Sequence, residues 1–203
     1  MSAEYRTLEQ PSQAVLREKM SKFIAFAMPV SSSEEARERI ARIANEYHDA
    51  RHVCWAYMIG AGGLEFQSND NGEPSGTAGK PILGQIRSAG LTYLAIAVVR
   101  YFGGIKLGTS GLISAYREAA RLAIEAGTVV TLYETSSVAF TFPYLAMNDV
   151  MRMVKESEAA IVSQTFDNSC AMTLSIRSDR AHALAERIAG ISGTSVTGIT
   201  PTS

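Results

Sequence analysis

The sequence has few cysteines, no long apolar run and almost no net charge, and each of these absences excludes a class of protein. The two cysteines, Cys54 and Cys170, lie far apart among 203 residues, which argues against a disulfide framework and favours two small buried side chains. No apolar run approaches the roughly 18 residues that a membrane-spanning helix needs. The longest, residues 94–99, has the length of a strand. Residues 1–19 are polar and charged and lack the apolar core of a signal peptide, so we expect a cytoplasmic protein with no membrane partner.

The balance of charge limits how the protein can attract a partner. Lysines and arginines number 19 against 20 aspartates and glutamates, which gives a formal net charge of −1. Proteins that bind nucleic acid through their overall charge are basic, so any electrostatic site in this chain must be local. A hydrophobic content of 46% and a charged content of 19% are typical of a globular chain, here long enough for two small domains.

The first 130 residues begin with a polar tail over residues 1–20 and then alternate strand-like and helix-like patterns. We expect strands at 23–28, 52–59 and 92–99, a hairpin partner at 64–67, and helices at 33–47, 77–89 and 109–126. The run at 92–99 is almost continuously apolar, which predicts a strand covered on both of its faces.

A second pattern follows a boundary near residue 130. We expect a strand at 137–142, a helix at 147–154, strands at 159–166 and 170–176, a helix at 179–189 and a strand at 195–199. This βαββαβ order is typical of a ferredoxin-like domain. The sequence therefore predicts an α+β chain with two domains, over residues 1–130 and 131–203.

The most distinctive stretch, residues 98–111, joins an apolar strand to the start of a long helix. Its candidate anion-binding residues are Arg100, Gly103, Gly104, Lys106 and Gly108. Glycine lets the backbone turn its N–H groups toward a bound anion, and a helix N-terminus attracts negative charge. We therefore expect this stretch to bind phosphate, on RNA or on a small ligand. In the alternative interpretation, the glycines serve only a tight turn and Arg100 pairs with a carboxylate.

A second glycine-rich segment, residues 76–80, resembles part of a nucleotide-binding P-loop. Pro81 stands where that motif needs serine or threonine, so an ATP site is not expected. We expect instead a second helix start that faces an anion, with Lys80 beside it. Asp70 and Glu73, just before this segment, are interpreted as loop carboxylates that cap a helix or pair with nearby cations.

Arg51 directly precedes the expected strand at 52–59 and His52 begins it, and both are further candidates for anion binding. Histidine exchanges protons readily near neutral pH, which also makes His52 a candidate acid or base. His52 and Cys54 share one strand face, but zinc needs about four ligands, so we expect no metal and no cofactor. Four aromatic residues could stack on bases or pack in the core: Tyr93, Tyr101, Phe102 and Tyr116.

Three segments, residues 50–54, 70–81 and 100–108, resemble the bacterial members of the IMPACT family, and Lys19-Met20-Ser21-Lys22-Phe23 fits as well. Members often have paired aspartates before Gly-Glu-Pro, whereas Asn71 is the second residue here. The resemblance implies an N-terminal domain like domain four of elongation factor G and the N-terminal half of GHMP kinases. It also implies a ferredoxin-like C-terminal domain and a role in translation control.

Three functions remain open from the sequence. The first is a binding protein without catalytic residues, which contacts RNA, the ribosome or a translation factor through the first domain. The second is an enzyme that acts on a phosphorylated small molecule in an anion-binding cleft, with Asp70, Glu73 or His52 as acid or base. The third is a protein–protein adaptor whose partner contacts the ferredoxin-like sheet.

Overall fold

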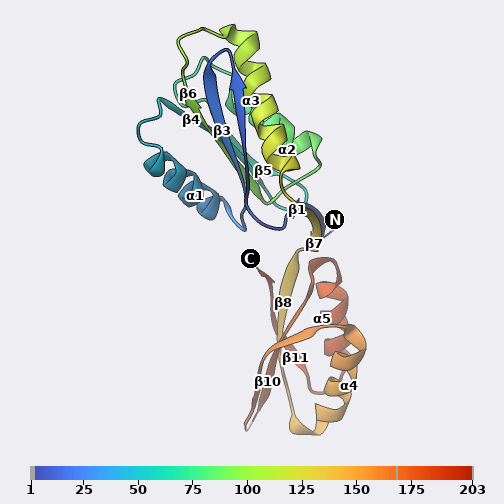
Figure 1. The fold of residues 1–203 in the computed structure, drawn as a ribbon. Coiled ribbons are helices and arrows are strands. Elements are labelled where there is room, and N and C mark those ends of the chain that lie inside the picture. The colour runs from blue at the N-terminus through green and yellow to red at the C-terminus, as the bar shows by residue number, and fades with distance from the viewer. Residues whose placement is uncertain (1–2, 168, 203) are drawn as a thin grey trace. The chain divides into compact units, whose positions relative to one another are not determined.

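A computed structural model describes residues 3–167 and 169–202, and its ribbon is drawn in Figure 1. Contacts group residues 5–132 into one compact unit, the N-terminal unit. The remaining described residues, 3–4 and 133–202, form a second, the C-terminal unit. The chain is thus α+β with two units, as the sequence predicted. The exact domain boundary, placed between residues 130 and 131 from the sequence, stays a prediction.

The N-terminal unit is built on a five-stranded sheet with helices on both faces (Figure 1). In spatial order the strands are β2 (Ser12–Glu18), β3 (Ser21–Pro29), β6 (Leu94–Tyr101), β4 (His52–Ile59) and β5 (Glu65–Asn69). All neighbouring strands pair antiparallel. The helices are α1 (Ser33–Glu46), α2 (Gly79–Ser88) and α3 (Gly108–Glu125).

The two faces of β6 explain its apolar sequence. Leu94, Ile96 and Val98 pack in the core formed with α2 and α3. Ala95, Ala97 and Val99 pack in the core formed with α1. Because successive side chains of a strand point to opposite faces, a central strand between two helical layers must be apolar at every position. The expected strand with both faces covered is confirmed.

The expected polar tail over residues 1–20 was wrong for the described residues 3–20, and residues 1–2 lie outside the described part of the chain. Strand β1 (Glu4–Leu8) pairs with β7 (Val129–Tyr133), and β2 pairs with β3 over its whole length. Strand β2 is an outer strand whose residues alternate between exposed and half-buried positions. About half of such a strand can be polar, and this composition hid the strand from a reading based on apolar runs.

The C-terminal unit has the ferredoxin-like order that the sequence predicted. Its elements are β8 (Thr135–Phe142), the 3₁₀ turn η1 (Tyr144–Ala146), α4 (Met147–Ser157), β9 (Ala160–Phe166), β10 (Cys170–Arg177), the 3₁₀ turn η2 (Ser178–Arg180), α5 (Ala181–Ala189) and β11 (Ser195–Thr202). The sheet order is β11-β8-β10-β9. Alternate residues of β8 and β10, including Phe140 and Met172, pack against α4 and α5.

No helix in the described part of the chain is both long and apolar enough to cross a membrane.

Candidate functional site

The strand pairing brings the two glycine-rich segments to one end of the five-stranded sheet. His52 lies opposite Arg100, and Lys22 lies opposite Tyr101. Strand β5 runs back along β4 and ends at the level of Trp55, so the loop that follows it reaches the same end. We call this end of the N-terminal unit the tip and define it as residues 18–22, 51–54, 70–80 and 100–108.

Asp70 organises the loop that leads into α2. Its carboxylate accepts hydrogen bonds from the backbone N–H groups of Gly76, Ala78 and Gly79, at 2.8, 3.0 and 2.8 Å. Burial by itself raises the pKa of Asp70, but the hydrogen bonds from these N–H groups outweigh it and the pKa is lowered. The expected anion at this helix start is therefore supplied by the chain itself, which corrects the prediction of a free anion site there.

Glu73 lies at the centre of a buried polar network. Its Oε1 atom accepts hydrogen bonds from Nη1 of Arg100 at 2.6 Å and from the hydroxyl of Tyr116 at 2.7 Å. The Cys54 thiol donates to the carbonyl oxygen of Asp70 at 2.9 Å, and its sulfur lies 3.3 Å from the Tyr116 hydroxyl. The network ties β4, β6 and α3 to the loop after β5.

Burial in this network keeps the Cys54 thiol and the Tyr116 hydroxyl protonated. Loss of solvent is the largest cause that raises the pKa of Cys54, to about 12, and it also raises the pKa of Tyr116. A thiol reacts as its thiolate, so Cys54 is an unreactive structural residue rather than a nucleophile. Tyr116 is fully buried, and it packs against Phe23 with ring centroids 5.2 Å apart. It is not available to stack on a base.

Arg100 is a buried partner of Glu73, which corrects its expected role as a surface ligand for anions. Only 7% of the Arg100 side chain and 4% of the Glu73 side chain are exposed. The guanidinium carbon lies 5.6 Å from the ring centre of Phe23 and 5.7 Å from that of Phe102. Within the described residues, Nε of Arg100 has no hydrogen-bond partner. The alternative that the sequence left open, pairing with a carboxylate, is the arrangement seen.

Other predicted site residues remain at the surface of the tip. Arg51, Lys80 and Lys106 are exposed. His52 is half-buried, and its Nδ1 atom lies 2.8 Å from the carbonyl oxygen of Asn71. Because a carbonyl oxygen only accepts, this contact places the ring proton on Nδ1 and leaves Nε2 for a ligand.

The glycines of the loop after β6 serve two different needs. Gly104 and Gly108 are exposed and have φ angles of +91° and +76°, in the region that favours glycine. Gly103 instead provides space, since a Cβ atom on it would lie 2.0 Å from the backbone carbon and oxygen of Met20. This loop therefore rests directly on the turn between β2 and β3.

Sequence reasoning missed the residues of that turn as part of the site. Lys19 and Met20 form a two-residue turn between β2 and β3, in which both have positive φ angles, 44° and 67°. Met20 is 74% exposed, and Phe102 and Ile105 in the neighbouring loop are 52% and 51% exposed. The available signal was the pair Lys19 and Lys22, which flank Met20 and Ser21 where β3 begins.

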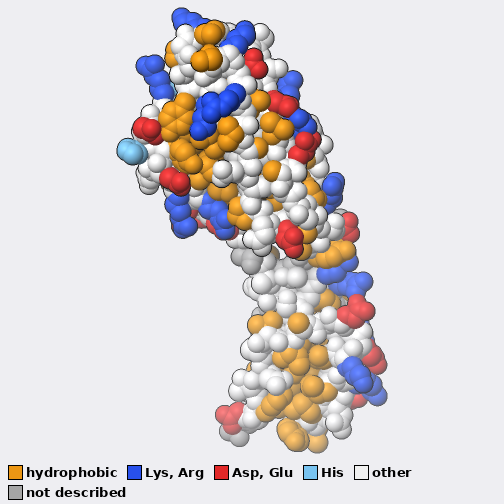
Figure 2. Space-filling view, viewed as in Figure 1, with side chains coloured by type: hydrophobic (Ala, Val, Ile, Leu, Met, Phe, Trp, Pro, Cys, Tyr) orange, Lys and Arg blue, Asp and Glu red, His pale blue; other side chains and the backbone are white. Residues whose placement is uncertain are grey.

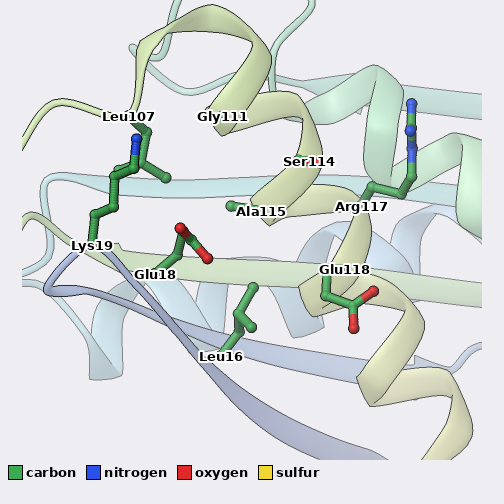
Figure 3. A pocket seen from close by; sticks show the side chains of 9 residues that line it. All are labelled: Leu16, Glu18, Lys19, Leu107, Gly111, Ser114, Ala115, Arg117 and Glu118. Carbon is green, nitrogen blue, oxygen red and sulfur yellow. The ribbon is translucent and has the colours of Figure 1, made fainter.

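A groove lies beside the turn, between β2 and α3. Its volume is about 400 Å³. Figure 3 shows its lining: Leu16, Glu18, Lys19, Leu107, Gly111, Ser114, Ala115, Arg117 and Glu118. The side chains of Leu16, Leu107 and Ala115 give it an apolar part, while two carboxylates, one hydroxyl and two cations surround them.

Across residues 3–167 and 169–202, no group of three or more histidine, cysteine, aspartate or glutamate side chains could hold a metal ion.

Comparisons with known proteins match the region that contains the tip. The model of the Impact N-terminal domain matches residues 19–124, which begin at the turn described above. A protein of Haemophilus influenzae named "IMPACT family member" is 34% identical over 171 residues, which cover 82% of this chain and 83% of that protein. "IMPACT family member YigZ" of Escherichia coli is 41% identical over 108 residues, about half of each chain.

A solved structure is similar over the whole length of the chain. It is titled "Crystal structure of an hypothetical protein", and it superimposes with a TM-score of 0.73 at 26% sequence identity. The alignment covers 100% of this chain and 98% of the solved one. Both units described above therefore recur together in a known structure.

Proposed function

Since this chain belongs to the IMPACT family, we propose that it is a binding protein with a role in translation, which contacts RNA through the tip. The RNA is free, or part of a ribosome or of a complex with a translation factor. Family membership supports a connection with translation regulation in general. The contact with RNA is our inference from the structure of the tip.

The observation that carries the proposal is the arrangement of charge at the tip. Arg51, Lys80 and Lys106 are exposed there, whereas the charge of Arg100 is paired internally with Glu73. Asp70 holds the start of α2, which carries Lys80, and the Glu73 network holds the end of β6, after which the loop with Lys106 begins. Cations on loops of fixed geometry suit a ligand with regularly spaced phosphates.

The strength of binding follows from the number of cations. Each phosphate of a single-stranded nucleic acid that the protein neutralises contributes about −0.7 to the slope of the logarithm of the binding constant against the logarithm of salt concentration. Arg51, Lys80 and Lys106 together contribute about −2 to this slope, to which any contact of Lys19 or Lys22 with a phosphate adds. Because the whole chain has a net charge of −1, little long-range attraction adds to these contacts. We expect modest affinity with clear salt dependence.

The enzyme alternative has less support because two of its three candidate acids and bases, Asp70 and Glu73, have structural partners, which leaves only His52 with a ring nitrogen for a ligand. The Asp70 carboxylate holds three backbone N–H groups. Glu73 is buried with Arg100 and Tyr116. A general base has to lie within hydrogen-bonding distance of the substrate, and both carboxylates are instead hydrogen-bonded to groups of the protein.

The adaptor alternative is favoured by two features of the C-terminal unit. The face of the sheet opposite α4 and α5 carries short side chains, such as Ser137, Ala139 and Thr141 of β8. The outer strand β9 also exposes Val162 and Phe166 by 60% and 49%. Recovery of a single protein partner by residues 128–203 alone would support this alternative.

The test of RNA binding compares two pairs of lysine and arginine substitutions. A labelled 20-nucleotide single-stranded RNA and purified ribosomal subunits serve as probes across a salt series. The variant Lys80→Ala/Lys106→Ala should weaken binding and reduce the salt slope by about 1.4. The variant Arg42→Ala/Lys155→Ala removes the same charge from exposed positions outside the tip and should leave both unchanged. An affinity for RNA that does not change with salt concentration, or an equal loss of affinity in the two variants, would contradict the proposal.

A further inference from the structure

The tip exposes three large apolar side chains close to its lysines. Met20, Phe102 and Ile105 are 74%, 52% and 51% exposed. We call them the apolar tip surface. The loop that carries Phe102 and Ile105 lies on the backbone of Met20, as the position of Gly103 shows. Figure 2 shows hydrophobic side chains flanked by Lys and Arg at the upper end of this unit. Such a surface is poorly suited to water and marks an interaction site.

The backbone conformation of Lys19 and Met20 indicates that the exposure of the Met20 side chain is a fixed feature of the turn. Two-residue turns with positive φ at both positions normally use asparagine and glycine, which adopt that conformation easily. Lys19 and Met20 adopt it here with full side chains. Strain of this kind persists where the surrounding structure enforces it, and it gathers at functional sites. The turn holds one cation and one apolar side chain outward at the apex of the hairpin.

Phosphates alone would not explain this surface. Lys19, Lys22 and Lys106 can contact a phosphate backbone, but Met20, Phe102 and Ile105 gain nothing from it. The outside of a nucleic-acid duplex offers mainly phosphate and sugar. Unpaired bases offer flat apolar faces, and aromatic side chains stack on them. The ring of Phe102 lies over the Arg100 guanidinium on one side and is half-exposed.

The groove beside the turn points to the same ligand. Its volume of about 400 Å³ lies in the range of small-molecule sites and is far too small for a double helix. Lys19 and Leu107 line it where it meets the tip (Figure 3). Glu18 and Glu118, which also line it, would repel a phosphate but would accept hydrogen bonds from the N–H groups of a base edge. The groove therefore fits a base that has left its stack.

We propose that the apolar tip surface and the adjoining groove bind unpaired bases, so that the chain recognises single-stranded or looped RNA rather than duplex RNA. This inference rests on the proposed RNA-binding function and names the form of RNA. The lysines supply affinity for any RNA, and the apolar side chains supply the choice between unpaired and paired RNA.

The test uses the full chain and two labelled probes, a 20-nucleotide single-stranded RNA and the same strand annealed to its complement. We expect the single strand to bind about tenfold more tightly, since stacking of one base is worth roughly that factor. The variant Met20→Ser/Ile105→Ser and the single variant Phe102→Leu, which keeps an apolar cover over Arg100, should each lose most of this preference with an unchanged salt slope. The variant Lys80→Ala/Lys106→Ala should keep the preference while affinity falls for both probes.

The results separate this inference from the proposed function. Equal binding of the two probes by the unsubstituted chain, or an intact preference in the apolar variants, would overturn the inference while RNA binding stands. Binding of neither probe would overturn both. Polyglutamate and vesicles that contain phosphatidylserine serve as competitors. Displacement of the single strand by either at equal charge concentration would assign the surface to an acidic protein or a membrane instead.

Discussion

Nη1 of Arg100 and Oε1 of Glu73 lie 2.6 Å apart although the two residues are 27 positions apart in the sequence, and both side chains are more than nine-tenths buried. The contact joins the end of β6 to the loop after β5. It removes from the surface the arginine that the sequence suggested as a ligand for phosphate. It also fixes the two loops whose remaining cations we assign to RNA binding.

Loss of the Glu73 carboxylate should destabilise the protein strongly. The variant Glu73→Gln leaves the Arg100 guanidinium buried without a counter-charge, which typically costs about 3–5 kcal/mol of unfolding free energy. Urea unfolding followed by circular dichroism measures this cost. As a control, Glu46→Gln changes an exposed glutamate at the end of α1 and should alter stability by less than about 0.5 kcal/mol. Similar costs for the two substitutions would contradict the structural role of the pair.

Two glycine-to-alanine substitutions should have opposite effects on stability. The new methyl group of Gly103→Ala would lie 2.0 Å from the backbone of Met20 and force the loop and the turn apart, at a cost of about 1–3 kcal/mol. The methyl group of Gly84→Ala, within α2, meets no atom within 4 Å. Alanine is the better helix former by about 0.5–1 kcal/mol, so this variant should be more stable than the natural chain. Thermal and urea unfolding of both variants would show the sign directly, and a stabilising Gly103→Ala would refute the close contact.

The contribution of Asp70 should disappear in acid. Burial raises the pKa of Asp70, but the hydrogen bonds from Gly76, Gly79 and Ala78 lower it by more than burial raises it. The folded-state pKa therefore lies below that of the unfolded chain. A lowered carboxyl pKa stabilises the fold above the unfolded pKa of about 3.9, and this stabilisation is lost as pH falls through the folded pKa. The difference in unfolding free energy between the natural chain and Asp70→Ala should therefore shrink between pH 5 and pH 2. A difference that stays constant with pH would show that the carboxylate is not engaged in the folded state.

The two cysteines should be unreactive in the folded protein. Burial raises the pKa of Cys54 to about 12, so almost no thiolate forms at pH 8, and Cys170 is also buried. Titration with a thiol-specific chromogenic disulfide should detect less than about one tenth of a thiol per chain under native conditions. After addition of denaturant it should detect both. Rapid native labelling of Cys54 would mean that the network around Glu73 opens readily.

The sequence alone determined the elements whose signal is local. The continuous apolar run of β6 indicated a strand between two layers, and the alternation along β8 and β10 indicated a sheet with one covered face. These patterns depend only on the geometry of a strand, in which side chains alternate between two faces. The glycine-rich segments were recognised for a similar reason, because positions such as Gly104 require a backbone that other residues adopt with strain.

Only the tertiary structure decided which charges remain at the surface. Arg100 and Lys106 look equally available in the sequence, yet the first is buried against Glu73 and the second is exposed. The difference depends on strand register and on which helices cover the end of β6, and neither is encoded near Arg100. The surroundings of Asp70 and Met20 also depend on distant residues. The Asp70 carboxylate lies at the start of α2, and the loop after β6 packs on the backbone of Met20. Local periodicity fixes the elements, whereas the environment of a charge depends on residues that are distant in the chain and become neighbours only on folding.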